Sequence, residues 1–427
     1  MKIVGIVASA FSIMLLVRPA VATSEQLFGF GPRDTALAQS DIADGRAATA
    51  AWVNPALLTA SGVRVVAGYS HGRTALTLNG EDSGVRDIAG TQLALQIGGK
   101  LGENVALGAG LAMHLPNRSL ARIAFSPGTE PSFVRFEPAS QSMSIDAAAA
   151  LRWGWFSVGV GASMLISANG QLDLNMKQDA RGAFADGNAD VVVPFNSAML
   201  IGLAADFGRA AGMAFRYRGA QAITLDFATA AMIDVQGNPL NGVTKVHIEG
   251  SSGYVPSTWD IAVRCSPTTG MRFMGALQLA TWSAAPGPAA NLSMDVELGL
   301  TPGLREGLFV RPNYRDTLSP RVGFEVSPGG EDSDVELRLG YAFVPSPVSQ
   351  PRGFASPVDA STHTIAAGAG VDLGKNWGVD LRVDAAVQWM MLNRRQFDKG
   401  RDAMPFARYE ADGFIAVGSV AVEGAWQ

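Results

Sequence analysis

The chain alternates apolar and polar side chains with a period of two residues. In residues 335–343, for example, Leu337 and Leu339 alternate with Glu336 and Arg338. Because a β-strand points successive side chains to opposite faces, such a segment has one apolar and one polar face. The pattern predicts strands near 63–71, 91–99, 104–113, 141–152, 154–166, 190–207, 210–219, 221–233, 243–250, 256–266, 270–282, 291–301, 319–328, 333–345, 362–374, 377–392 and 411–426.

Many amphipathic strands in one chain are typical of a transmembrane β-barrel, whose apolar faces meet lipid and whose polar faces line the lumen. Beyond the N-terminal segment there is no run of about eighteen apolar residues, so helical membrane spans are not predicted. No linker-like break divides the chain into soluble domains. We therefore expect an all-β, antiparallel transmembrane barrel in the bacterial outer membrane, in contact with outer-membrane lipid.

The first residues have the organisation of a secretion signal. Lys2 is followed by an apolar stretch, residues 3–17, that is short for a bilayer span, and residues 20–22 read Ala-Val-Ala, a small-x-small cleavage site. We expect residues 1–22 to be a signal peptide and the mature chain to begin near Thr23. The alternative is a short N-terminal anchor helix.

The composition agrees with a membrane barrel. Only 17% of the residues are charged, whereas soluble proteins carry about a quarter, and 49 residues are glycine. There is no basic cluster, which argues against nucleic acid as a partner. The single cysteine, Cys265, cannot form an internal disulfide.

Two long connections, residues 114–140 and 345–361, contain several prolines, which excludes them from central strands. Long loops of outer-membrane barrels lie on the extracellular side. The first loop mixes arginine with phenylalanine, a composition suited to an amphiphile with a carboxylate head, although it also fits a loop that packs on itself. Its candidate substrate contacts are Phe125, Phe133, Phe136, Arg118, Arg122 and Arg135.

Residues 23–60 lack strand alternation and are too apolar to be well solvated. A plug folded inside the barrel would bury them, and a large barrel needs such filling if it is not to leak. We therefore divide the mature chain into a plug or hatch, residues 23–60, and a barrel, residues 61–427. Phe28, Phe30 and Leu37 of the hatch are further candidate contacts for an apolar substrate.

The hatch carries the motif Asn54-Pro55-Ala56 between the signal and the first strand. In this it resembles the FadL/TodX family of outer-membrane transporters for long-chain fatty acids and other hydrophobic compounds. The segments 30–38, 256–263 and 337–343 also resemble that family, so the likeness spans nearly the whole mature chain, with gaps around 114–250. It implies a monomeric barrel of about 14 strands with the hatch inside the lumen.

The resemblance also implies the mechanism, which is passive diffusion of a hydrophobic compound through a barrel gated by the hatch. The expected compound is a long-chain fatty acid. Exit through an inward kink in an early strand is one form of this mechanism. Gly108 and Gly110 are candidates for such a kink, because glycine within a strand often marks a bulge or bend, although the chain is rich in glycine throughout.

Catalytic and metal motifs are absent from the sequence. The histidines His71, His114, His247 and His363 show no metal-ligand spacing, and there is no Gly-x-Ser-x-Gly element. We expect no enzyme activity, no metal and no cofactor. The alternatives left open are uptake of aromatic hydrocarbons by the same fold, a general porin, and a structural or adhesive barrel.

Overall fold

The fold was analysed in a computed structural model of the chain. It describes residues 24–44, 48–117, 131–136, 142–166, 169–179, 182–192, 195–235, 242–285, 291–297, 304–306, 313–330, 333–351, 356–376, 378–400 and 406–426. The expected signal peptide, residues 1–22, lies outside the described residues.

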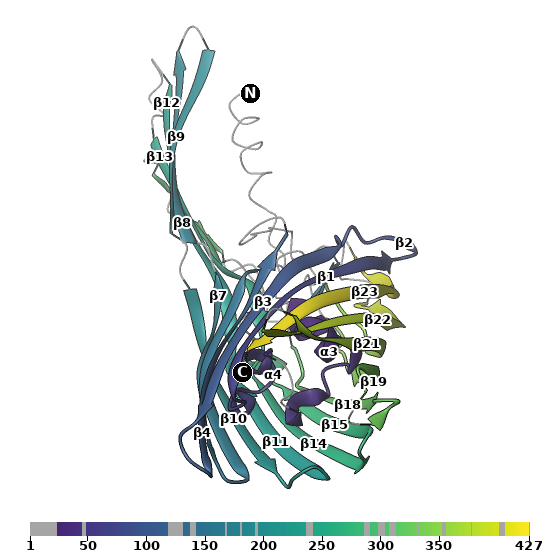
Figure 1. Ribbon diagram of the computed structural model, residues 1–427. Coiled ribbons are helices and arrows are strands. Elements are labelled where there is room, and N and C mark those ends of the chain that lie inside the picture. The colour runs from purple at the N-terminus through teal and green to yellow at the C-terminus, as the bar shows by residue number, and fades with distance from the viewer. Residues whose placement is uncertain are drawn as a thin grey trace.

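Fourteen antiparallel strands form a closed barrel (Figure 1), as the sequence predicts. The first strand, β1, pairs with both the last strand, β23, and its sequence neighbour β3, and this closes the sheet. A two-residue strand, β2 (Glu81–Asp82), extends the edge of β1. The barrel strands are β1 (Gly62–Leu78), β3 (Ile88–Lys100), β4 (Val105–Pro116), β6 (Ser144–Trp153), β7 (Phe156–Ile166), β10 (Phe195–Asp206), β11 (Ala211–Arg218), β14 (Thr258–Thr268), β15 (Met271–Ala280), β18 (Thr317–Val326), β19 (Val335–Val344), β21 (Thr362–Asn376), β22 (Val379–Asp398) and β23 (Arg408–Trp426).

The alternation seen in the sequence separates lipid-facing from lumen-facing side chains. On β19, Leu337 and Leu339 are exposed on the outer surface, whereas Glu336 and Arg338 are buried inside. The same division holds on β22, where Trp389 is exposed beside buried neighbours. An apolar exterior and a polar interior are the arrangement that a bilayer requires of a barrel.

Connections differ strongly between the two ends of the barrel. Turns such as the one between Trp153 and Phe156 are short, and the chain enters and leaves the barrel at the same end, where Val63 pairs with Trp426. Long connections lie at the opposite end. Short turns are periplasmic and long loops extracellular in this class of barrel, which sets the orientation.

Six strands in the long connections form a separate sheet that extends beyond the barrel (Figure 1). The segments 221–233 and 243–250, and residues 291–297 of the predicted strand 291–301, which look like barrel strands in the sequence, belong to this extracellular sheet. They alternate as barrel strands do because a sheet outside the membrane also has two different faces. The strands are β8 (Asn169–Asp179), β9 (Gly182–Val192), β12 (Gln221–Val235), β13 (Gly242–Val255), β16 (Asn291–Glu297) and β17 (Leu304–Glu306).

The two proline-containing loops meet across the mouth of the barrel. A short strand of the first, β5 (Ser132–Phe133), pairs in parallel with a short strand of the second, β20 (Pro357–Val358). We call residues 131–136 and 356–361 together the lid. A short helix in a third connection, η4 (Trp282–Ala284), packs in the same apolar cluster as the lid.

Residues 24–44 and 48–58 lie inside the barrel (Figure 1). They form α2 (Ser24–Phe28), α3 (Gly31–Ala36), η1 (Asp41–Ala43), α4 (Ala50–Val53) and η2 (Pro55–Leu57). Nearly all of their side chains are buried. In the described part of the chain no helix is long and apolar enough to cross a membrane.

One side of the hatch rests on glycines of the barrel wall. A Cβ added to Gly108 of β4 would lie 1.9 Å from the carbonyl oxygen of Leu58, and one added to Gly202 of β10 would lie 2.0 Å from Oδ1 of Asn54. A Cβ added to Gly159 of β7 would lie 2.3 Å from the Pro55 carbonyl carbon. Only glycine permits such close approach, so these positions are seats for residues 54–58.

The same seats account for the glycines proposed as a strand kink. The pairing of β4 with β3 and with β6 runs through Gly108 and Gly110 without a register shift. The described strand therefore has no bulge here. A Cβ at Gly110 would lie 2.5 Å from the side chain of Leu58, so both glycines make room for the hatch.

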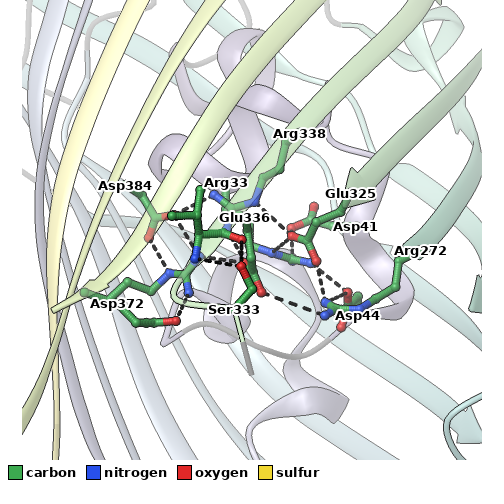
Figure 2. Close-up of polar contacts among 12 residues, drawn as sticks. Arg33, Asp41, Asp44, Arg272, Glu325, Ser333, Glu336, Arg338, Asp372 and Asp384 are labelled. Atoms are coloured by element: carbon green, nitrogen blue, oxygen red, sulfur yellow. Dashed lines mark hydrogen bonds and ion pairs between the residues drawn. The ribbon is translucent and has the colours of Figure 1, made fainter. Parts of the chain in front are cut away.

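The opposite side of the hatch is held by buried ion pairs (Figure 2). Arg33 of α3 contacts Asp41 at 3.0 Å and Asp44 at 2.6 Å within the hatch, and Glu325 of β18 at 3.2 Å. Each of these four side chains is less than a tenth exposed. Charges buried to this degree need compensation, and here the pair of Arg33 with Glu325 provides part of it across the boundary between hatch and wall.

The ion pairs continue along the wall as one network. Arg338, whose side chain is fully buried, contacts Glu325 at 2.9 Å, Glu336 at 2.6 Å and Asp384 at 2.5 Å. Strands β15 and β22 contribute two more arginines and β21 a further carboxylate: Arg272, Arg382 and Asp372. The network links the hatch to five neighbouring strands.

We expect Gly108→Ala to displace residues 54–58, because the new methyl group overlaps the Leu58 carbonyl. Hydrogen–deuterium exchange of these residues should rise while the barrel keeps its heat-modifiable migration on gels. Gly99→Ala on β3 is the matched control, since a Cβ there meets nothing within 4 Å. Equal exchange in the two variants would contradict the seat.

We expect Arg33→Met to release the charged side of the hatch, because it leaves the buried Asp41 without the cation that it contacts among the described residues, at about 3–5 kcal/mol. It also removes the pair with Glu325 that joins hatch to wall. Exchange of residues 31–44 should increase in an intact barrel. Arg152→Met is the control, because the Arg152–Asp206 pair is 43% exposed on both sides and contributes about 0–1 kcal/mol. Unchanged exchange in Arg33→Met would show that the network does not hold the hatch.

Candidate functional site

A cavity of about 70 Å³ lies in the lumen between the hatch and the lid. Its apolar lining includes Leu27 and Trp52 of the hatch and Trp282 and Met390 of the surrounding wall and loops. Arginine, glutamine, serine and threonine side chains of the barrel complete it. A space of this size holds only a few water molecules.

Two of the cavity's arginines are fully engaged. Arg216 donates to Asp260 at 3.0 Å and to the Val53 carbonyl at 2.9 Å. Arg218 binds both oxygens of Asp146, at 3.0 and 2.9 Å. These arginines therefore have carboxylate partners, and they also hold the carbonyl end of α4 against the wall.

Arg218 has a second contact, with the hatch aromatic at the cavity. Its guanidinium lies over the Trp52 ring, 4.0 Å from the centroid. Phe30 of the hatch stacks on Trp52, and the two ring centroids are 5.9 Å apart. Cation–π and stacking contacts fix the indole as part of the cavity wall.

Arg321 differs from its neighbours. It is 5% exposed, and it donates only to amide oxygens, Gln39 at 2.5 Å and Gln278 at 2.7 Å, while its Nε has no partner. Among the described residues no carboxylate lies within 4.0 Å of its guanidinium. The nearby carboxylate of Asp260 is bound by Arg216, and Gln278 stands between. A buried cation that lacks an anion is therefore present at the cavity.

The hatch residue that meets Arg321 has an unusual backbone. Ala38 and Gln39 have φ values of 49° and 62°, in the left-handed region that residues other than glycine seldom adopt. This turn brings the Gln39 amide to the wall, where its Nε2 also donates to the Gln26 carbonyl at 3.1 Å. The contact thus joins hatch, cavity and barrel.

The Asn-Pro-Ala motif forms a fixed turn at the glycine side of the hatch. Oδ1 of Asn54 accepts from the Ala56 amide at 3.1 Å, and its Nδ2 donates to the Ile42 carbonyl at 3.1 Å and, more weakly, to the Leu203 carbonyl of β10 at 3.4 Å. Pro55 opens the short helix η2. Asn54 therefore ties two parts of the hatch to each other and to the wall.

The lid is locked by a buried ion pair. Arg135 donates to the Asp359 carboxylate at 2.9 Å and to the Ala360 carbonyl at 2.6 Å. Burial raises the pKa of Asp359, against the opposing attraction of Arg135. Arg135 also lines the cavity. The lid residue that faces the lumen is thus the one that holds the two loops together.

The remaining predicted contacts occupy the protein core. Phe133 and Phe136 are fully buried in the lid cluster, and Phe28 packs in the same cluster. Phe30 stacks on Trp52, and Leu37 lies against Gly340 of β19. Of the predicted contacts that are described, only Arg135 lines the cavity. Phe125, Arg118 and Arg122 lie outside the described residues.

The sequence analysis missed Arg216, Arg218 and Arg321 as site residues. Their signal was present, because each stands on the polar face of an alternating strand. What the alternation does not give is which inward residues lie level with the cavity, since this depends on register and on the fold of the hatch.

A second cavity, of about 620 Å³, lies at the periplasmic end. It is lined by turn residues and by members of the ion network, such as Asp44, Arg272 and Glu336. Its charged lining suits water and ions rather than an apolar solute. This cavity therefore carries carboxylates as well as arginines, whereas the charged residues that line the first cavity are arginines.

No protein-family model matches the sequence, and no curated protein matches it either. Solved structures do match. A FadL homologue from Pseudomonas aeruginosa is 12% identical with a TM-score of 0.55, over 96% of this chain and 99% of that one. The monoaromatic hydrocarbon channel CymD is 12% identical with a TM-score of 0.54, over 95% and 99%.

The P. putida toluene transporter TodX is also 12% identical, with a TM-score of 0.52 over 96% of this chain and 99% of that chain. At this level of identity a likeness establishes the fold and not the substrate. The closed barrel, the hatch within it and the near-complete coverage of these structures give one conclusion: the chain has the FadL/TodX fold.

Proposed function

We propose that this protein transports a hydrophobic compound with an anionic head, most of all a long-chain fatty acid, across the bacterial outer membrane. The observation that carries the proposal is Arg321, a buried cation without a carboxylate partner among the described residues, beside a cavity whose mixed lining includes the apolar side chains of Leu27, Trp52 and Met390. The fold supports it, because the FadL homologue, CymD and TodX share this architecture. Passage is passive diffusion, and no cofactor takes part.

The chemistry of the cavity favours an amphiphile. Burying an ion without compensation costs roughly several kcal/mol, so Arg321 gains from any anion that reaches it. A carboxylate accepts two parallel hydrogen bonds from a guanidinium. Leu27, Trp52 and Met390 offer the acyl chain an apolar surface. Head and tail of one molecule are thus both satisfied.

The hatch is the gate in this proposal. Residues 1–22 are removed as the signal peptide, residues 23–60 form the hatch, and residues 61–427 form the barrel. A cavity of about 70 Å³ is too small for a long acyl chain, so transport requires the hatch, the lid or both to move. The protein works as a monomer, because the lumen of one barrel holds the whole site.

The alternatives separate by the charge of the solute. An aromatic hydrocarbon, the compound named for CymD, needs an apolar cavity but no cation. A general porin needs an open aqueous lumen, whereas the hatch fills this one. Neither alternative gives Arg321 a role.

We expect Arg321→Gln to slow uptake of a long-chain fatty acid by roughly 10- to 100-fold, the range of one charge-assisted hydrogen-bond pair. Uptake of the matching fatty alcohol should change little. The measurement is uptake of labelled solute by cells that lack their own transporter, at matched surface levels. Arg408→Gln is the control, because the Arg408 side chain is 78% exposed and pairs with Asp398. Equal losses for acid and alcohol would remove the head-group role, and an uptake of toluene alone would favour the hydrocarbon channel.

We expect Asn54→Ala and Pro55→Ala to impair uptake while the barrel stays folded. Alanine at position 54 removes the side-chain contacts to Ile42, Ala56 and Leu203, and alanine at 55 frees the turn. Uptake of the fatty acid and heat-modifiable migration are measured together. Uptake at the wild-type rate in both variants would argue against gating by this turn.

A further inference from the structure

Strand register explains why Arg321 has no carboxylate partner among the described residues. The residues directly opposite Arg321 are Ala276 on β15 and Ala342 on β19, and neither has a polar side chain. Arg216, by contrast, stands directly opposite Asp260 on β14 and pairs with it at 2.9 Å. Directly opposite side chains are the ones that meet first across a sheet, so Arg321 must reach past its alanine neighbours for a partner.

Gln278 of β15 links Arg321 to Asp260 through a single amide. Its Oε1 accepts from Nη2 of Arg321 at 2.7 Å, and its Nε2 donates to Oδ1 of Asp260 at 2.9 Å. The other oxygen of Asp260 accepts from Nε of Arg216 at 3.0 Å. Both oxygens of this fully buried carboxylate are therefore occupied, and neither lies within 4.0 Å of the Arg321 guanidinium.

Gln39 holds the same guanidinium from the hatch in the same way. Its Oε1 accepts from Nη1 of Arg321 at 2.5 Å, and its Nε2 donates to the Gln26 carbonyl at 3.1 Å. Each of the two glutamines thus presents its oxygen to Arg321 and its nitrogen to a separate acceptor. The guanidinium is oriented from two sides by dipoles and by no opposite charge.

Only an amide can serve both ends of such a link. A glutamine side chain carries an acceptor and a donor, whereas an ionised glutamate only accepts and lysine and arginine only donate. Glutamate at position 39 or 278 would place a permanent carboxylate on Arg321. Because a tethered group competes at a high effective concentration, it would exclude the carboxylate of a solute.

The arrangement also leaves room for an incoming anion on Arg321. Its Nε has no partner among the described residues, and the guanidinium lines the cavity. A carboxylate that binds Nε together with a neighbouring Nη displaces one amide oxygen, while the other amide keeps the guanidinium in place. An uncharged head group gains much less from the same exchange, since hydrogen bonds between neutral and charged groups are weaker than those between two ions.

We propose that Gln39 and Gln278 are specificity-determining residues of the lumen, which position Arg321 without neutralising it and so select an acid over its uncharged counterpart. Both act through Arg321 and are positioning residues. The inference rests on the proposed function, because it concerns how the same site chooses its solute. It adds that the choice depends on two amides, one from the hatch and one from the wall.

The test is uptake of labelled oleate and of oleyl alcohol by cells that lack their own transporter, with the full-length protein at matched surface levels. Gln278→Glu should lower oleate uptake by roughly 10- to 100-fold, the range of one charge-assisted pair, and leave alcohol uptake close to that of the wild type. Gln39→Glu should do the same from the hatch side. Gln350→Glu is the matched control, because Gln350 is exposed and donates to the Asp398 carbonyl away from the cavity. Heat-modifiable migration checks that each barrel is folded.

The acid-to-alcohol ratio separates a selective role from a merely structural one. Equal losses of acid and alcohol in both glutamate variants would show that the glutamines only brace the packing, and would overturn the inference. Gln388→Glu adds the same charge to the same cavity, at a residue to which Arg321 does not donate. If it lowers oleate uptake as much as Gln278→Glu does, the charge of the whole cavity sets the selectivity and the inference is wrong.

Arg321→Gln distinguishes a failure of this inference from a failure of the proposed function. If Arg321→Gln abolishes the preference for oleate while Gln39→Glu and Gln278→Glu keep it, the proposed function stands and the role of the two glutamines is refuted. If Arg321→Gln itself keeps the preference, the proposed function fails and the inference fails with it.

Discussion

Fourteen strands enclose more space than their inward side chains fill, and the hatch occupies that space. Its fit to the wall uses two kinds of contact. On one side, glycines of β4, β7 and β10 let the backbone of residues 54–58 touch the strands. On the other, buried ion pairs around Arg33 join the hatch to β18 and its neighbours. The first contact is steric and insensitive to charge, whereas the second is electrostatic and fails when one partner is lost.

The charges of the lumen follow from this filling. A polar interior that is packed rather than wet must pair its ions, and most arginines here do so: Arg33, Arg216, Arg218 and Arg338 each contact at least one carboxylate. Arg321 instead meets two amides. Amide dipoles offset part of the desolvation of a guanidinium, but less than a carboxylate does. The charge of Arg321 is therefore less well compensated than that of the other four arginines, and Arg321 lies beside the cavity.

The sequence predicted those features that local pattern determines. Alternation such as that of residues 335–343 gave the barrel and its lipid-facing side, and the apolar composition of residues 23–60 gave the hatch. The sequence predicts barrel strands where the structure has extracellular ones, because alternation does not distinguish a surface that faces lipid from one that faces water. The cavity was missed, because its contacts join distant parts of the chain: Gln39 and Arg321 are 282 residues apart.

Two glycines of β4 show in another way that a local pattern does not reveal contacts with distant parts of the chain. The sequence predicts a bend at Gly108 and Gly110, since within one strand a bend is what glycine most often signals. The reason in the structure is a neighbour, Leu58, that no local pattern reveals. Where barrel strands touch the hatch, glycine is the residue that permits the contact, as at Gly108, Gly110, Gly159 and Gly202.

The charged lining of the periplasmic cavity bears on how a solute leaves. A neutral hydrocarbon that passed the hatch toward the periplasm would enter a space lined by Asp44, Arg272 and Glu336, where apolar surface gains nothing. A fatty acid would gain little there either, because Arg272 and Arg382 are already paired with carboxylates that line the same space. The distinction between the two substrate classes therefore rests on Arg321, on the extracellular side of the hatch, and the periplasmic cavity retains neither solute.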